Sequence, residues 1–170
     1  MTISELLLLD FDSQILNTRR TIERLTDDLG DYAPHEKSMK LGKLAMHCAS
    51  LPLFGLYIME DEGMDLANST RPQSDFTWTT VAAALERLDE PAAKCRAAIA
   101  ASSDEHLTKD WKFTYGEQLI SHDSRAKSFR IMCFNHLIHH TAQLGVYLRL
   151  NNLAVPGLYG PSADESWAPK

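Results

Sequence analysis

Four stretches of the chain carry apolar residues at three- and four-residue spacings, which predicts four amphipathic helices. We expect them over about residues 4–29, 38–60, 77–101 and 129–149. The recurring apolar positions are Leu8, Phe11, Ile15, Ile22, Leu25 and Leu29, then Leu44, Leu51, Phe54 and Ile58, then Val81, Leu85, Leu88, Ala92, Cys95 and Ile99. Four such helices predict an all-α four-helix bundle, with residues 1–170 as a single domain.

Prolines interrupt two of these patterns. Pro52 and Pro91 lie inside the second and third stretches, and we expect a kink at the first and a kink or break near Asp89 at the second. The kink at Pro52 is either incidental or opens the bundle beside His47. Residues 61–76 have no periodicity, which predicts a linker that crosses one end of the bundle.

The segment before the last helix is the least helical part of the chain. Gly116 is flanked by apolar and aromatic residues, which favours a short hairpin or an irregular, ordered loop over residues 102–123. After residue 150, prolines and glycines exclude a continuing helix, while Ser162 and Glu165 match a capping box that predicts one final short turn.

Composition and charge narrow the classes of partner. The chain is 44% hydrophobic and 24% charged, as is ordinary for a soluble globular protein. Its net charge of −6, without a clustered basic face, argues against a nucleic-acid partner; Arg125, Lys127 and Arg130 are interpreted as a solvated helix flank. No uninterrupted apolar run reaches the ~20 residues that span a bilayer, so no membrane partner is expected. The leucine run 6–9 lacks the basic start of a signal peptide.

Two further expectations come from cysteine and leucine positions. Cys48, Cys95 and Cys133 all lie in apolar helical contexts, which indicates buried free thiols in a reducing compartment, so the cytoplasm is the expected location.

The first helix has more apolar surface than one bundle face requires, at Leu6, Leu7 and Leu9. This excess predicts a homodimer interface.

Histidines on core-facing positions are the main chemical signal. His136 and His140 are four residues apart and share one helical face, while His47 lies on the apolar stripe of the second helix. Imidazoles directed into a hydrophobic seam need partners, and one metal ion can satisfy all three. Three nitrogen ligands leave at least one coordination position for water or substrate, as catalytic metals require. No cysteine pair or acidic helical motif accompanies them, which excludes a zinc finger and a di-iron bundle.

Neighbouring residues leave alternatives open. His139 would replace His140 if the helical register differed, and otherwise is a second-layer or surface residue. Gln143 either orients a ligand or a metal-bound water, or is a boundary glutamine bonded to backbone. Tyr147 is interpreted as a packing residue. Three other histidines are expected in loops, namely His35, His106 and His122.

The segments LGKLAMHC, NHLIHHTAQLGVYLRL and VPGLYGPSADE resemble the DinB family, the DinB/YfiT-like metalloenzyme superfamily. The resemblance implies an up-down-down-up bundle, often a homodimer, with a divalent metal held by His47, His136 and His140 and with His139 outside the ligand set. Family members with assigned activities include thiol-dependent S-transferases and a mycothiol-dependent isomerase. Many relatives have Arg-Gly where this chain has Thr141 and Ala142, so any role of that arginine does not carry over.

The histidine pattern predicts a metal-dependent enzyme that acts on a small molecule. The resemblance implies a thiol-dependent transferase or hydrolase-like protein, with a low-molecular-weight thiol as co-substrate. The expected cofactor is a divalent metal ion, zinc or nickel first, with iron, copper or manganese as alternatives. The alternatives are a non-catalytic metal-binding or stress-response protein and a structural dimer with a vestigial site. No catalytic residue is assigned, because Glu60, Asp61 and Glu62 look like a solvated helix end rather than a general base.

Overall fold

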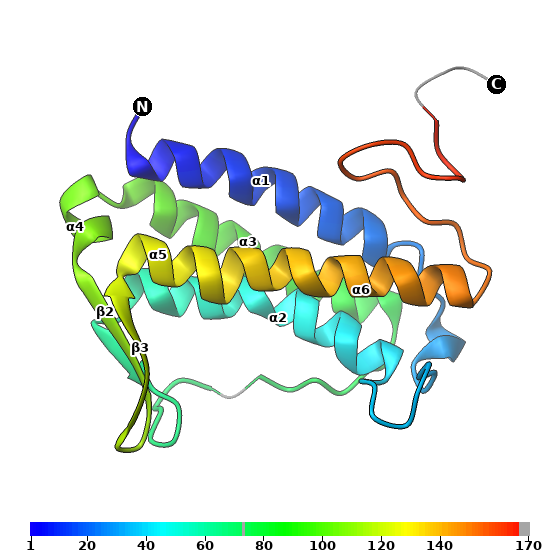
Figure 1. Ribbon diagram of the computed structural model, residues 1–170, viewed down its shortest axis with the longest axis horizontal. Helices are drawn as coiled ribbons and strands as arrows, with labels where there is room; N and C mark the ends of the chain where they lie inside the picture. Colours follow the sequence, from blue (N-terminus) through cyan, green and yellow to red (C-terminus); the bar gives the residue numbers. More distant parts are fainter. Residues whose placement is uncertain (73, 167–170) are drawn as a thin grey trace.

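The computed structural model describes residues 1–72 and 74–166, and its four longest helical segments form a bundle (Figure 1). The first three are α1 (Ile3–Ile22), α2 (Leu41–Glu60) and α3 (Val81–Ala101). The fourth is continuous but has three parts, α5 (Arg125–Phe129), the π-helix η2 (Arg130–Asn135) and α6 (His136–Leu150). The described residues also form two short helices, the 3-10 helix η1 (Asp27–Leu29) and α4 (Asp104–Thr108).

The helices run up, down, down and up (Figure 1). α1 and α2 each pack against both α3 and α6, so the four helices close around a common interior. Because α2 and α3 point the same way, the chain between them must return over the length of a 20-residue helix, about 30 Å. It runs along the bundle (Figure 1), so the prediction that residues 61–76 cross one end was wrong.

A small sheet stands at one end of the bundle, and it corrects the all-α expectation. β1 (Gly63–Asp65) pairs in parallel with β2 (Asp110–Tyr115), which pairs antiparallel with β3 (Gln118–Ser124). Of the two forms predicted before the last helix, the structure has the hairpin. Gly116 makes its turn with a φ of +56°, a conformation that glycine adopts without steric cost. β1 has three residues, too few for a periodic pattern to reveal it.

Several predicted boundaries differ from the observed ones. α1 begins with a capping box between Thr2 and Glu5 and ends at Ile22, earlier than the apolar pattern indicated. α3 continues through Pro91, so the break near Asp89 was wrong. The hydroxyl of Ser162 accepts from the backbone N–H of Glu165, but no helix follows within the described residues. The carboxylate of Glu165 binds Arg20 and Arg24 instead of completing the capping box.

Two clusters of buried apolar side chains fill the bundle. In the sequence, His136 lies between Cys133, which belongs to one cluster, and Leu137, which belongs to the other.

The three cysteines are buried and free, as predicted. Leu7 is only 3% exposed and belongs to the core, so among the leucines proposed for a dimer interface only Leu6 and Leu9 lie at the surface.

Arg125 was wrongly placed in a solvated flank, because its side chain is fully buried. Its guanidinium donates to the carbonyl oxygens of Ile58 and Asp61, at the end of α2. These carbonyls have no partner within their own helix, so Arg125 satisfies backbone acceptors that the helix end leaves open. Lys127 and Arg130, by contrast, are exposed, as the sequence predicted.

One described helix, α2, has the length and apolar character of a membrane span, although no uninterrupted apolar run in it reaches that length. In the bundle, 78% of its most apolar window is buried by other helices. This is the position of a core helix, and its hydrophobicity is explained by burial on nearly all sides.

Candidate metal centre

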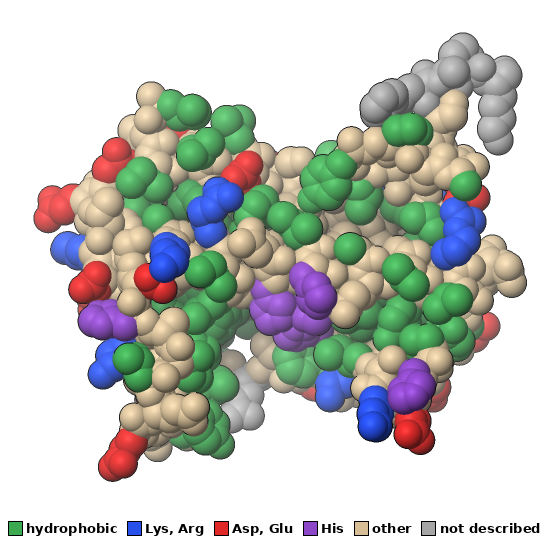
Figure 2. Space-filling model, in the orientation of Figure 1, with side chains coloured by type: hydrophobic (Ala, Val, Ile, Leu, Met, Phe, Trp, Pro, Cys, Tyr) green, Lys and Arg blue, Asp and Glu red, His purple; other side chains and the backbone are tan. Residues whose placement is uncertain are grey.

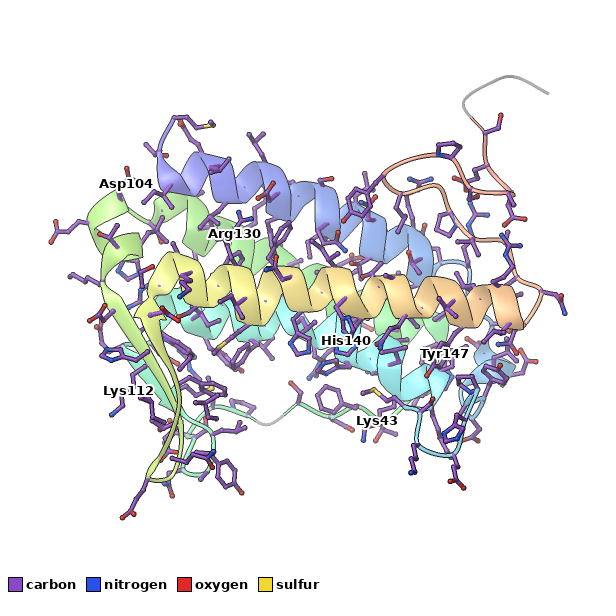
Figure 3. All side chains as sticks on the ribbon, viewed as in Figure 1. Lys43, Asp104, Lys112, Arg130, His140 and Tyr147 are labelled. Carbon is purple, nitrogen blue, oxygen red and sulfur yellow. The ribbon has the colours of Figure 1, made fainter. Side chains whose placement is uncertain are left out.

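The imidazole of His47 on α2 lies next to those of His136 and His140 on α6. One ring nitrogen from each lies within 4.8 Å of the other two. The Nε2 atoms of His47 and His136 are 3.2 Å apart, close to the ~3.4 Å that separates two ligands placed tetrahedrally at about 2.1 Å from one ion. Figure 3 shows His140 on the side of α6 that faces α2.

Hydrogen bonds at the opposite ring nitrogens orient two of these imidazoles. Nδ1 of His140 lies 2.7 Å from Oε1 of Gln143, and Nδ1 of His136 lies 3.2 Å from the carbonyl oxygen of Met132. Because these oxygens only accept, each Nδ1 carries the proton, and each Nε2 keeps its lone pair. In His136 this free Nε2 faces Nε2 of His47, and in His140 Nε2 is the nitrogen left to bind a metal.

The π-helix explains how backbone can orient His136. In a regular α-helix, the backbone N–H of His136 would bond to the carbonyl of Met132. Here that N–H bonds to Cys133, which leaves the Met132 carbonyl available to the imidazole. Single π turns occur often at functional sites, and this one directly precedes the first histidine of α6.

Gly55 allows α2 to approach the last helix closely near the cluster. A Cβ atom at this position would lie 2.7 Å from Sγ of Cys133 and 2.9 Å from a ring carbon of Phe129. Gly55 follows His47 by two turns, and Cys133 precedes His136 by three residues. The contact at Gly55 therefore helps to set the distance between the two helices that carry the histidines.

Burial keeps the three imidazoles in the neutral form that binds metal. It lowers the pKa of His47 to about 4, with smaller contributions from His140, His136 and Lys43. Burial is also the main cause that lowers the pKa of His136 and of His140. The cluster contains no carboxylate, so its donor set is purely nitrogen and suits zinc, nickel, copper or iron.

The remaining histidines lie outside the cluster. His139 is exposed, and its ring centroid lies 4.8 Å from that of His140. His106 was expected in a loop but lies in α4, where its Nε2 is 2.9 Å from the carbonyl oxygen of Met59. His35 is exposed in a loop, as expected, whereas His122 lies on β3.

Tyr147 is buried, and its hydroxyl donates to the carbonyl oxygen of Met39. The structure therefore supports the interpretation of Tyr147 as a packing residue.

A cleft of about 810 Å³ opens beside the histidines, and sequence reasoning missed it. Figure 2 shows the hollow between the hairpin and the histidines, with hydrophobic side chains along its sides. Its walls come from α2, the sheet, the linker that precedes α3, and η2. These four segments are far apart in the sequence and come together only in the folded chain, so no local sequence pattern could predict the cleft. His47 and His136 line the cleft, so the candidate site is open to a small molecule.

Comparison with known proteins identifies relatives of this fold. The profile of the DinB superfamily matches residues 11–144. A DinB-like protein from Bacillus cereus ATCC 10987 superposes with a TM-score of 0.66 at 18% identity, over 89% of this chain and 95% of that one. A DinB-like protein from Bacillus subtilis gives 0.66 at 20% identity, over 88% and 94%. No functionally curated protein sequence matches the chain.

Proposed function

The chain belongs to the DinB superfamily, and we propose that it is a metal-dependent enzyme with one divalent ion held by His47, His136 and His140. The observation that carries the proposal is the convergence of three imidazoles, two of them with Nδ1 bonded to an oxygen and Nε2 free to coordinate. Zinc or nickel is the proposed metal, and iron, copper and manganese are the alternatives.

Such an ion supplies Lewis-acid chemistry and lowers the pKa of a water molecule or thiol that takes its remaining coordination position. The protein orients the metal ligands and the substrate. Gln143 and the Met132 carbonyl hold two rings in place, and the adjacent cleft receives the molecule to be attacked. The proposed reaction is thiol-dependent transfer or hydrolysis of a small electrophile. The choice of a low-molecular-weight thiol as co-substrate rests on the family resemblance.

The test is a turnover screen with protein purified without a histidine tag and loaded with zinc or nickel. The panel combines low-molecular-weight thiols with alkylating electrophiles, and includes activated esters for hydrolysis. Turnover should disappear after chelation and in His136→Ala, and should persist in His139→Ala, which removes an exposed imidazole from the same turn. Undiminished turnover in metal-free protein would contradict the proposal.

A second candidate is a non-catalytic metal-binding protein with a role in stress response. Among the described residues, no carboxylate joins the histidine cluster as a candidate general base, which favours this alternative. It predicts metal binding with no rate above background for any pair in the same panel.

We also propose a cytoplasmic homodimer. Buried free cysteines are consistent with a reducing compartment, and Leu6 and Leu9 are 45% and 65% exposed on α1. Elution as a monomer in gel filtration would contradict the dimer.

A further inference from the structure

We propose that the cleft beside the histidines binds a neutral, mainly hydrophobic small molecule, with its reactive end at the imidazoles. This inference names the substrate class of the proposed enzyme and so rests on the proposed function. The volume of about 810 Å³ is within the 300–1,000 Å³ typical of small-molecule sites. It is continuous with the candidate metal centre, because His47 and His136 form part of its lining.

Apart from the proposed metal ion, the described residues that line the cleft offer no unpaired positive charge to an anionic ligand. Apart from the histidines, Arg71 is the one ionisable side chain with a permanent charge at neutral pH among the described residues that line the cleft. That charge is already paired, because Arg71 donates two hydrogen bonds to Asp61 and one of 3.0 Å to Glu60, and its guanidinium lies over the Tyr57 ring. Phosphate and carboxylate sites need cationic donors that are not already neutralised.

Four large apolar side chains that line the cleft are exposed to solvent. Leu66, Tyr115, Ile120 and Ile131 are between 44% and 57% exposed, and all four line it. They come from three separate segments, the linker, the hairpin and η2. A hydrophobic guest would remove these surfaces from water, which is the main source of affinity in such pockets.

Half-buried aromatic rings are also part of the cleft lining. Phe54 meets Phe113 with ring centroids 5.7 Å apart and planes at 65°, and Phe76 stands edge-on to His47 at 5.2 Å. Rings at these angles present both faces and edges to a guest, which suits an aromatic or branched apolar body.

Strand β3 provides a matched pair of positions for the test. Leu119 pairs with Thr114 and Ser121 pairs with Phe113, while Ile120 lies between them at an irregularity of the ladder. Ile120 lines the cleft and is 47% exposed; Leu119 is 54% exposed and is outside the lining. The same substitution at both positions replaces a half-exposed aliphatic side chain on one strand with a polar one, and contact with the guest is the difference that the comparison tests.

The test is a fluorescence titration with 1-naphthol and 1-naphthyl phosphate, on the full chain with zinc bound and after chelation. 1-Naphthol should bind both forms. In the chelated form, where no metal ion attracts the ester, it should bind about tenfold or more tightly than 1-naphthyl phosphate. Ile120→Asn should weaken 1-naphthol binding about tenfold, and Leu119→Asn less than about twofold. If Ile120→Asn does not fold, Ile131→Gln in η2, which also lines the cleft, replaces it, with the exposed Val146→Gln on α6, outside the lining, as control.

Tighter binding of the phosphate ester by the chelated protein, equal effects at the paired positions, or no 1-naphthol binding would overturn the inference. Failure of zinc to bind while 1-naphthol binds as expected would overturn the proposed enzyme and leave the cleft assignment standing.

Discussion

Nδ1 of His136 lies 3.2 Å from the carbonyl oxygen of Met132, one helical turn earlier. The carbonyl is available because the backbone N–H of His136 bonds to Cys133 within the π-helical turn. A distortion of the main chain thus fixes the tautomer of a candidate ligand, a role that a carboxylate side chain often has. His140 is oriented by a side chain instead, the amide of Gln143.

Replacing Gln143 should weaken metal binding without removing it. Gln143→Leu deletes the acceptor for Nδ1 of His140, and loss of such a partner typically costs about 10- to 100-fold in metal affinity. Gln143→Glu keeps an acceptor oxygen and should bind metal at least as well as the wild type. Competition titration with a chromogenic chelator measures both. Equal affinities for Gln143→Leu and wild type would contradict the orienting role.

Gly55→Ala should destabilise the bundle. Its Cβ would overlap Cys133 and Phe129 at the contact between α2 and the last helix, and overpacking of this kind costs about 1–3 kcal/mol. Gly145→Ala is the control, since its Cβ would meet only Val155 at 3.8 Å. The control should stabilise α6 by up to about 1 kcal/mol. Urea unfolding gives both free energies, and destabilisation of similar size in the two variants would count against the close approach.

The metal-free protein should lose stability as the pH falls from about 6.5 towards 4. Burial lowers the pKa of His47 from 6.5 to about 4, so between these values the unfolded chain binds a proton that the folded chain does not. Stability therefore rises with pH across this window. His136 and His140 act in the same direction. Urea midpoints at several pH values should show a shallower slope for His47→Gln than for wild type; identical slopes would contradict the assignment.

Arg125→Met should cost about 1–3 kcal/mol, because it leaves the buried carbonyl of Ile58 without its donor and that of Asp61 with Trp111 alone. Arg130→Met is the matched control on the same helix. Arg130 is exposed and forms a surface ion pair with Asp10, so its loss should change the free energy of unfolding by less than about 1 kcal/mol. Urea or thermal unfolding measures both losses of stability. An equal loss in Arg130→Met and Arg125→Met would refute the capping role.

Helical periodicity was sufficient to predict the bundle, because α2, α3 and α6 bury the apolar stripes that the sequence shows. It was also sufficient to place His47, His136 and His140 on core-facing positions, and the structure brings these rings together. The ligand roles themselves stay proposals. Gln143 was singled out from its spacing to His140, and the contact is present.

Features that depend on long-range packing were not predictable. β1 is too short to carry a pattern and exists through its pairing with β2, more than 40 residues later in the chain. The π turn leaves the apolar spacing of residues 129–149 almost unchanged, so it has no sequence signal of its own. Arg125 was misplaced because charged residues are rarely buried, and only the end of α2 explains the exception.

The most direct test of the central claim is elemental analysis of untagged protein after equilibration with zinc or nickel. Wild type and His139→Ala should each hold about one ion per chain, and His47→Ala, His136→Ala and His140→Ala should each hold far less. Equal metal content in His136→Ala and wild type, or no metal in the wild type, would contradict the three-histidine site.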